Sequence, residues 1–325
     1  MKNNLTLAIC AYNCEQYISE TLTCIVNQTF QDFDLFIIND CSTDNSKEII
    51  EEFFKKNSRQ YSLVDFEENK GLSAGRHYVE NLVLTKYILF VDADDCPYPN
   101  LVEKLYNKIT SDEDLMAVGC YHKFIDSHSK IIGGGIFLGE TTKEGFYLKA
   151  KSKKLIFMQP TAIINRKALL QVGGRNINGF FEGKPRYQDL CEDLDLWTRM
   201  SDLYIDGKAI VVVPEVLCKY RKHEQALSSN ALGMILRMRH IKTNLLLRRA
   251  RKIEKTFVEF YNSLSEEELT QLKRKSKAAD CLRNGAFLLK KGKVFIGSKN
   301  VLQSIFAEPG YLWQKIKSNS GLFKK

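Results

Sequence analysis

The sequence predicts an α/β protein in which an open, mostly parallel sheet flanked by helices is followed by a C-terminal helical region. Strand-like apolar runs alternate with amphipathic stretches through the first part of the chain, and only helical patterns follow residue 230. No apolar segment approaches the roughly 20 residues of a membrane span. With 325 residues, 44% of them hydrophobic, the chain can bury a large core.

The strands and helices of the sheet region alternate in order. Strand-like runs are expected at 5–10, 35–38, 62–66 and 87–91, and the helical stretches between them at 15–27, 45–54 and 72–84. Parallel strands joined by single helices need crossover connections, which place helices on both faces of the sheet.

After residue 95 the alternation becomes looser. We expect a hairpin over 130–138 with its turn at Gly133–Gly135, a helix at 194–203, and two short strands at 209–213 and 216–220. Helices are then expected at 232–251, 266–290 and 298–306. The change in composition near Asn230 predicts two domains, 1–230 and 231–325.

The cysteines indicate the cellular compartment of the protein, and the charges indicate what the C-terminal region could bind. The nine cysteines form no C-x-x-C pair, which favours free, mostly buried thiols in a reducing cytoplasm.

Residues 231–325 hold 21 Lys and Arg against 7 Asp and Glu, whereas the remainder is mildly acidic. A basic region of this kind fits an anionic membrane surface. The alternatives are a solvated helical face, packing on the body of the protein, or a contact with a second subunit in a homodimer.

Polar residues follow each predicted strand, at the edge where open α/β sheets bind ligands. No glycine lies between Met1 and Gly71, which excludes the dinucleotide-binding fingerprint. Asp40 follows the second strand, and Asp92 and Asp94 follow the fourth. Carboxylates gathered at a strand end suit a hard divalent cation, Mn²⁺ or Mg²⁺, with phosphate oxygens. We expect Asp95 to cap a helix that begins near Pro97.

These residues together resemble a known family. The resemblance covers about 5–228 and rests on five motifs in order, namely 11–13, 27–30, 38–44, 69–76 and 90–95, and more loosely on 159–161, 173–174, 192–199 and 220–223. The sequence resembles the family 2 glycosyltransferases, which have the GT-A fold of an open mixed sheet flanked by helices. It departs from the family at Asn39 and Cys41, where aspartate and glycine are frequent, and at Cys10, where proline is.

The resemblance implies roles for individual residues. The nucleotide-sugar would be bound by Tyr12, Asp40, Asn69, Arg76, Asp92 and Arg221. Asp94 would ligate the metal, and His223 would join it or the diphosphate. Asp193 would be the catalytic base, with Glu192 and Trp197 at the acceptor or its loop.

The predicted function follows from these roles. We expect a metal-dependent, inverting hexosyl- or N-acetylhexosaminyltransferase that moves a sugar from a UDP-sugar to a glycan or lipid-linked glycan in cell-surface polysaccharide synthesis. It would be cytoplasmic or peripheral on the inner face of the membrane, and it would not bind nucleic acid. A sugar nucleotidylyltransferase and a non-catalytic carbohydrate- or membrane-binding scaffold are the alternatives.

Overall fold

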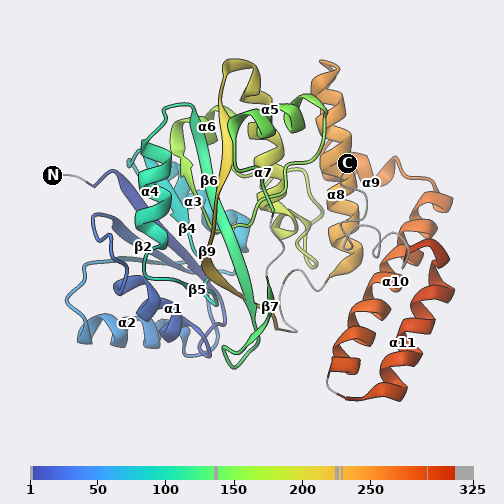
Figure 1. Ribbon diagram of the computed structural model, residues 1–325, viewed down its shortest axis with the longest axis horizontal. Helices are drawn as coiled ribbons and strands as arrows, with labels where there is room; N and C mark the ends of the chain where they lie inside the picture. The colour runs from blue at the N-terminus through green and yellow to red at the C-terminus, as the bar shows by residue number, and fades with distance from the viewer. Residues whose placement is uncertain (1–2, 135–137, 224–226, 228–229, 291, 312–325) are drawn as a thin grey trace. The chain divides into compact units, whose positions relative to one another are not determined.

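The computed structural model describes residues 3–134, 138–223, 227, 230–290 and 292–311, which form two compact units (Figure 1). The first unit comprises Met1–Asn178, Cys191–Ala226 and Ile241–Ile253, and the second comprises Gly179–Leu190, Leu227–His240 and Glu254–Lys325. The units therefore alternate along the chain, whereas the sequence suggested a single boundary at 230.

A mixed sheet of nine strands forms the centre of the first unit. The strands are β1 Leu5–Ala11, β2 Asp34–Asn39, β3 Ser62–Asp65, β4 Tyr87–Phe90, β5 Cys96–Pro97, β6 Leu115–Ile125, β7 Ile131–Gly134, β8 Ala162–Asn165 and β9 Ala209–Arg221. Their order is β3-β2-β1-β4-β8-β6-β9-β5, with β7 beside β6. The strands β3, β2, β1 and β4 are parallel, and antiparallel pairs join β8 to β4 and to β6.

The helices flank this sheet or form the second unit. They are α1 Ile18–Val26, α2 Ser46–Lys56, α3 Leu72–Leu82, α4 Leu101–Thr110, α5 Lys143–Lys151, α6 Arg166–Gln171, α7 Glu192–Met200, α8 Ala231–Arg249, α9 Phe257–Asn262, α10 Glu266–Lys290 and α11 Val294–Ala307. Short 3-10 turns occur at Tyr187–Asp189 and Ser201–Asp206. The predicted fold class, a mixed open sheet flanked by helices with a helical C-terminal region, is confirmed.

Two local predictions need correction. The strands expected at 209–213 and 216–220 are one strand, β9, because Pro214 lies in a register shift against β6 where no ladder hydrogen bond is required of it. The hairpin is formed by β6 and β7 across 126–130, and its turn is not at Gly133–Gly135. Residues 135–137 lie outside the described part of the chain.

The second unit has an aromatic core of its own. Leu236, Phe257 and Phe260 are buried in it, and Phe180 stacks on Phe257 with ring centroids 5.7 Å apart. The helix α9, which the sequence pattern did not reveal, begins with a capping box at Thr256. The stacking of Phe180 on Phe257 explains why residues 179–190 belong to this unit, although they lie far from Phe257 in the sequence.

One pair of cysteines departs from the expectation of nine free thiols. Cys24 of α1 and Cys96 of β5 form a disulfide, with their Cα atoms 5.8 Å apart. The other seven form no disulfide within the described residues, and four of these, Cys14, Cys120, Cys191 and Cys218, are buried. The two partners are 72 residues apart in the sequence, so their spacing gave no sign of the pairing.

Candidate active site

The candidate site lies beyond the carboxyl ends of β2, β1 and β4, which are parallel neighbours and open onto one edge of the sheet. Asn13 and Cys41 follow two of these strands with φ values of 46° and 57°, and Cys191 precedes α7 with a φ of 55°. A left-handed conformation costs a non-glycine residue about 1–2 kcal/mol and is concentrated at functional sites. The φ of Cys41 also explains why glycine suits that position in the family.

Asp40 organises the loop that leads into α3. Its side chain is buried, and Oδ1 accepts a hydrogen bond from the backbone N–H of Lys70 at 2.7 Å. Oδ2 accepts from the N–H of Gly71 and from Nδ2 of Asn69, both at 2.8 Å. The structure therefore brings Asp40 and Asn69 together, and the carboxylate fixes the position of the Asn69 amide.

Asp94 and His223 meet although 129 residues separate them. Nε2 of His223 lies 2.9 Å from Oδ2 of Asp94, and the imidazole packs against the ring of Tyr17. Among the described residues no group of three or more His, Cys, Asp or Glu side chains could hold a metal ion. One carboxylate and one imidazole at this separation still fit a cation whose other positions are taken by diphosphate oxygens and water.

Arg221 holds the backbone around Asp94. Its side chain is 1% exposed, and Nε donates to the carbonyl oxygen of Asp94 at 2.7 Å. Nη1 donates to the carbonyl oxygen of Asp126 at 2.9 Å, and Nη2 pairs with Glu20 at 2.7 Å. In this arrangement the guanidinium positions the strand end that carries Asp94, and all three of its nitrogens already have acceptors.

Asp95 does not cap a helix, which corrects the sequence expectation. The helix α4 begins at Leu101, and Oδ1 of Asp95 instead accepts the backbone N–H of Arg221 at 2.9 Å. Its Oδ2 is buried and has no hydrogen-bond partner among the described residues. Burial, together with the charges of Asp94 and Asp92, raises the pKa of Asp95 well above its usual value.

A buried chain of charges connects the strand end after β4 with the start of α7. Arg76 of α3 pairs with both Asp92 and Glu192, and Arg175 pairs with both Glu192 and Glu80. Burial opposes the ionised form of Glu192, but Arg175 and Arg76 outweigh that effect and lower its pKa. Burial raises the pKa of Asp92 despite the adjacent Arg76.

Asp193 differs from Glu192 in its electrostatic surroundings. Burial and the negative charge of Glu192 raise its pKa to about 7. Asp193 lies close enough to Arg76 and Tyr220 to influence the pKa of each, as does Asp92. The predicted base therefore shares one electrostatic environment with the predicted nucleotide and metal residues.

The remaining two predicted residues differ in exposure. Tyr12 follows β1 and is 42% exposed, so its ring is available to a ligand at the sheet edge. Trp197 is fully buried within the hydrophobic core of the first unit. In that position it offers no surface to an acceptor, and it stabilises α7 by packing.

Sequence reasoning missed three residues of this site. Arg175 and Glu80 complete the charge chain. Burial, together with the charges of the nearby aspartates, raises the pKa of Tyr220. The available signal was Gly174, whose φ is 64° and where a Cβ would come within 3.0 Å of Oε2 of Glu80. The glycine permits the close approach of a buried carboxylate, but the sequence does not show which one.

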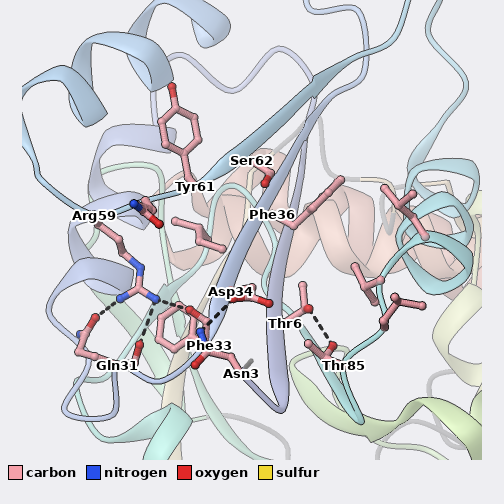
Figure 2. Close-up of a pocket in the computed structure, with 15 residues that line it drawn as sticks. Asn3, Thr6, Gln31, Phe33, Asp34, Phe36, Arg59, Tyr61, Ser62 and Thr85 are labelled. Carbon is pink, nitrogen blue, oxygen red and sulfur yellow. Dashed lines mark hydrogen bonds between the residues drawn. The ribbon is translucent and has the colours of Figure 1, made fainter. Parts of the chain in front are cut away.

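A pocket of about 570 Å³ lies at the opposite edge of the sheet, at the amino ends of β1, β2 and β3 (Figure 2). Several of its polar groups bind one another: Arg59 Nη2 donates to the carbonyl oxygen of Phe33 at 2.7 Å, and Asn3 Nδ2 donates to Asp34 at 2.9 Å. Thr6 and Thr85 share a buried hydrogen bond. None of the carboxylates of the candidate site lines this pocket.

None of the helices in the described ranges is both long and apolar enough to span a bilayer.

Known proteins with similar sequences include glycosyltransferases. The family model described as Glycosyl transferase family 2 matches residues 6–173, which include Asp40, Asp92 and Asp94. An uncharacterized glycosyltransferase of Haemophilus influenzae is 28% identical over 229 residues, 69% of this chain and 67% of that one. Glycosyltransferase GlyA of Streptococcus pneumoniae is 33% identical over 230 residues, 70% of this chain but only 32% of GlyA.

The fold is shared with a solved structure. Residues 1–349 of TarS from S. aureus superpose with a TM-score of 0.56 at 18% identity, covering 95% of this chain and 91% of that structure. TarS has also been crystallised with UDP-GlcNAc. The mixed sheet described above thus has the GT-A-like arrangement. Because the family model covers more than half of the sequence, this chain belongs to glycosyl transferase family 2.

Proposed function

We propose that the chain is a metal-dependent, inverting glycosyltransferase that moves a sugar from a UDP-sugar to a hydroxyl group of a glycan or lipid-linked glycan during cell-surface polysaccharide synthesis. The observation that supports this most directly is the Arg76 charge chain, which links Asp92 to Glu192. It joins the strand end that carries the Asp94–His223 pair to the start of α7, where the pKa of Asp193 is raised to about 7. The complex of the structural relative TarS with UDP-GlcNAc supports a uridine donor.

The donor would lie along the edge of the sheet. Tyr12 offers an exposed ring at the end of β1. Asp40, at the end of the neighbouring strand β2, fixes the loop that carries Asn69. Asp94 and His223 would hold Mn²⁺ or Mg²⁺ next to the diphosphate. A divalent cation at that position supplies charge stabilisation for the leaving nucleoside diphosphate.

Asp193 would remove the proton from the acceptor hydroxyl as it attacks the sugar. A general base is most effective when its pKa is near the working pH, which suits a value of about 7. Glu192 is a poor base because two arginines stabilise its ionised form. Attack from the side opposite the leaving diphosphate inverts the anomeric centre and needs no covalent intermediate.

Calorimetry with UDP and Mn²⁺ tests the metal assignment. Asp94→Ala should weaken Mn²⁺-dependent UDP binding about tenfold or more, because it removes a charged metal ligand. The same change at Asp34, at the amino end of β2 and far from the predicted ligands in the sheet, is the matched control and should leave affinity unchanged. Full affinity in the Asp94 variant would refute the assignment.

The dependence of activity on pH tests the base. Only the ionised form of Asp193 accepts a proton, so kcat/KM should rise with pH and level off above about 7. Below that point the rate should fall about tenfold per pH unit. A profile that is flat between about pH 5 and about pH 8 would contradict a base with this pKa. Mass spectrometry of UDP-sugar hydrolysis with Mn²⁺ first identifies the donor for these assays.

A further inference from the structure

Large apolar side chains project into solvent from the outer face of α11. Phe295, Leu302 and Phe306 are 86%, 54% and 85% exposed. Their spacing of seven and four residues places them on one stripe of the helix. Exposed phenylalanines aligned in this way are unusual on a water-facing helix, where the apolar stripe normally faces the core.

Small residues occupy the opposite face of α11, where it packs on α10. A Cβ at Gly285 would lie 2.9 Å from the carbonyl oxygen of Gly297, and one at Gly297 would lie 2.7 Å from Cγ of Leu289. The buried hydroxyl of Ser304 donates to the carbonyl oxygen of Ala278 at 2.7 Å. The small residues let the two helices approach closely, and the large apolar side chains are left on the outer face of α11.

The turn between the two helices extends the apolar surface and adds positive charge. Phe287 precedes the turn and Val294 follows it, and they are 49% and 63% exposed. Between residues 281 and 307 the sequence has five Lys or Arg and no Asp or Glu. Lys293 and Lys299 are exposed beside the apolar stripe.

We propose that α11 and its turn with α10, here called the α11 face, bind the headgroup region of an anionic bilayer. The phenylalanines would reach the acyl boundary while the lysines contact lipid phosphates. The charge argues against a second copy of the chain, because a two-fold contact would place this basic surface against itself without a single carboxylate from 281–307. The proposal concerns where the enzyme works and holds for any sugar it transfers.

The α11 face is a better candidate for membrane binding than α8. That helix is the other segment of residues 231–325 that combines basic and apolar side chains. Arg248 and Arg249 of α8 both pair with Asp202 at 2.6 Å. Arg239 pairs with Glu268, and Lys242 donates to the carbonyl oxygen of Lys153. These charges already have protein partners, and buried Leu236, Ile241 and Leu245 fix the apolar side of the helix.

Vesicle co-sedimentation of the full chain tests the proposal. The wild type should bind vesicles of equal parts phosphatidylcholine and phosphatidylglycerol, bind pure phosphatidylcholine much less, and release the mixed vesicles as salt rises. Phe295→Ser with Phe306→Ser should lower partitioning about tenfold for each side chain. Lys293→Gln with Lys299→Gln should lower it roughly fivefold for each lysine, on mixed vesicles only.

The matched control replaces two equally exposed apolar residues of the first unit. Ile205→Ser with Leu148→Ser removes side chains that are 75% and 72% exposed and should leave vesicle binding unchanged. Thermal unfolding checks each variant, and tryptophan fluorescence of Phe306→Trp gives a second readout, a blue shift on adding mixed vesicles. Wild-type binding by the double phenylalanine variant, or no shift in Phe306→Trp, would overturn the proposal. A dimer in light scattering that the phenylalanine changes dissociate, without vesicle binding, would assign the face to a second copy instead.

Discussion

Replacing Asp193 with asparagine should lower turnover by about 10²- to 10⁴-fold while leaving affinity for the UDP-sugar largely unchanged. Asparagine is nearly isosteric with aspartate but cannot accept the proton of the acceptor hydroxyl. The measurement is the turnover number under saturating donor, with UDP-sugar affinity determined separately by calorimetry. Activity close to that of the wild type would refute the proposed mechanism and leave the fold assignment untouched.

The Glu192→Gln variant, at the adjacent residue, is the comparison for Asp193→Asn. Glu192 accepts from Arg76 and Arg175 in the buried charge chain, so its loss should weaken the positioning of α7 and should not remove the proton acceptor. We expect a smaller fall in turnover than for Asp193→Asn, together with a loss of stability. A severe fall in Glu192→Gln beside an active Asp193→Asn would move the base by one residue.

The fold could be predicted from the sequence where local pattern and global structure agree. The strands β1, β2 and β3 are each followed by a helix, and the helix after β3 leads into β4. That alternation of short apolar runs with helices is sufficient to predict a parallel sheet. The strands after residue 95 are different, because β8 lies between β4 and β6 in the sheet although β6 precedes it in the chain. Such pairings depend on contacts between distant residues, which periodicity does not report.

The candidate site, like the fold, could be predicted from the sequence only in part. Asp40, Asp92 and Asp94 could be placed at the sheet edge because they follow the parallel strands β2 and β4, which lie on either side of β1. The sequence could not show that the guanidinium of Arg221 faces inward or that Trp197 is fully buried. Orientation and burial depend on tertiary packing, and so does the pairing of Arg175 with Glu80 across 95 residues.

Replacing Arg175 with methionine should lower the free energy of unfolding by about 3–5 kcal/mol, because it leaves two buried carboxylates without their shared partner. The side chain of Arg175 is 1% exposed, that of Glu80 is 0% exposed, and that of Glu192 is 6% exposed. Urea unfolding measures the effect.

The contrasting pair is Lys104 with Glu215, a surface ion pair with side chains 46% and 45% exposed. Lys104→Met should cost at most about 1 kcal/mol, since water already solvates both charges. Adding Glu80→Gln to Arg175→Met should cost less than the sum of the two single changes, because the double variant no longer buries an unpaired charge at Glu80. Equal losses for Arg175→Met and Lys104→Met, or strict additivity in the double variant, would show that the buried chain of charges does not hold α3 to the start of α7.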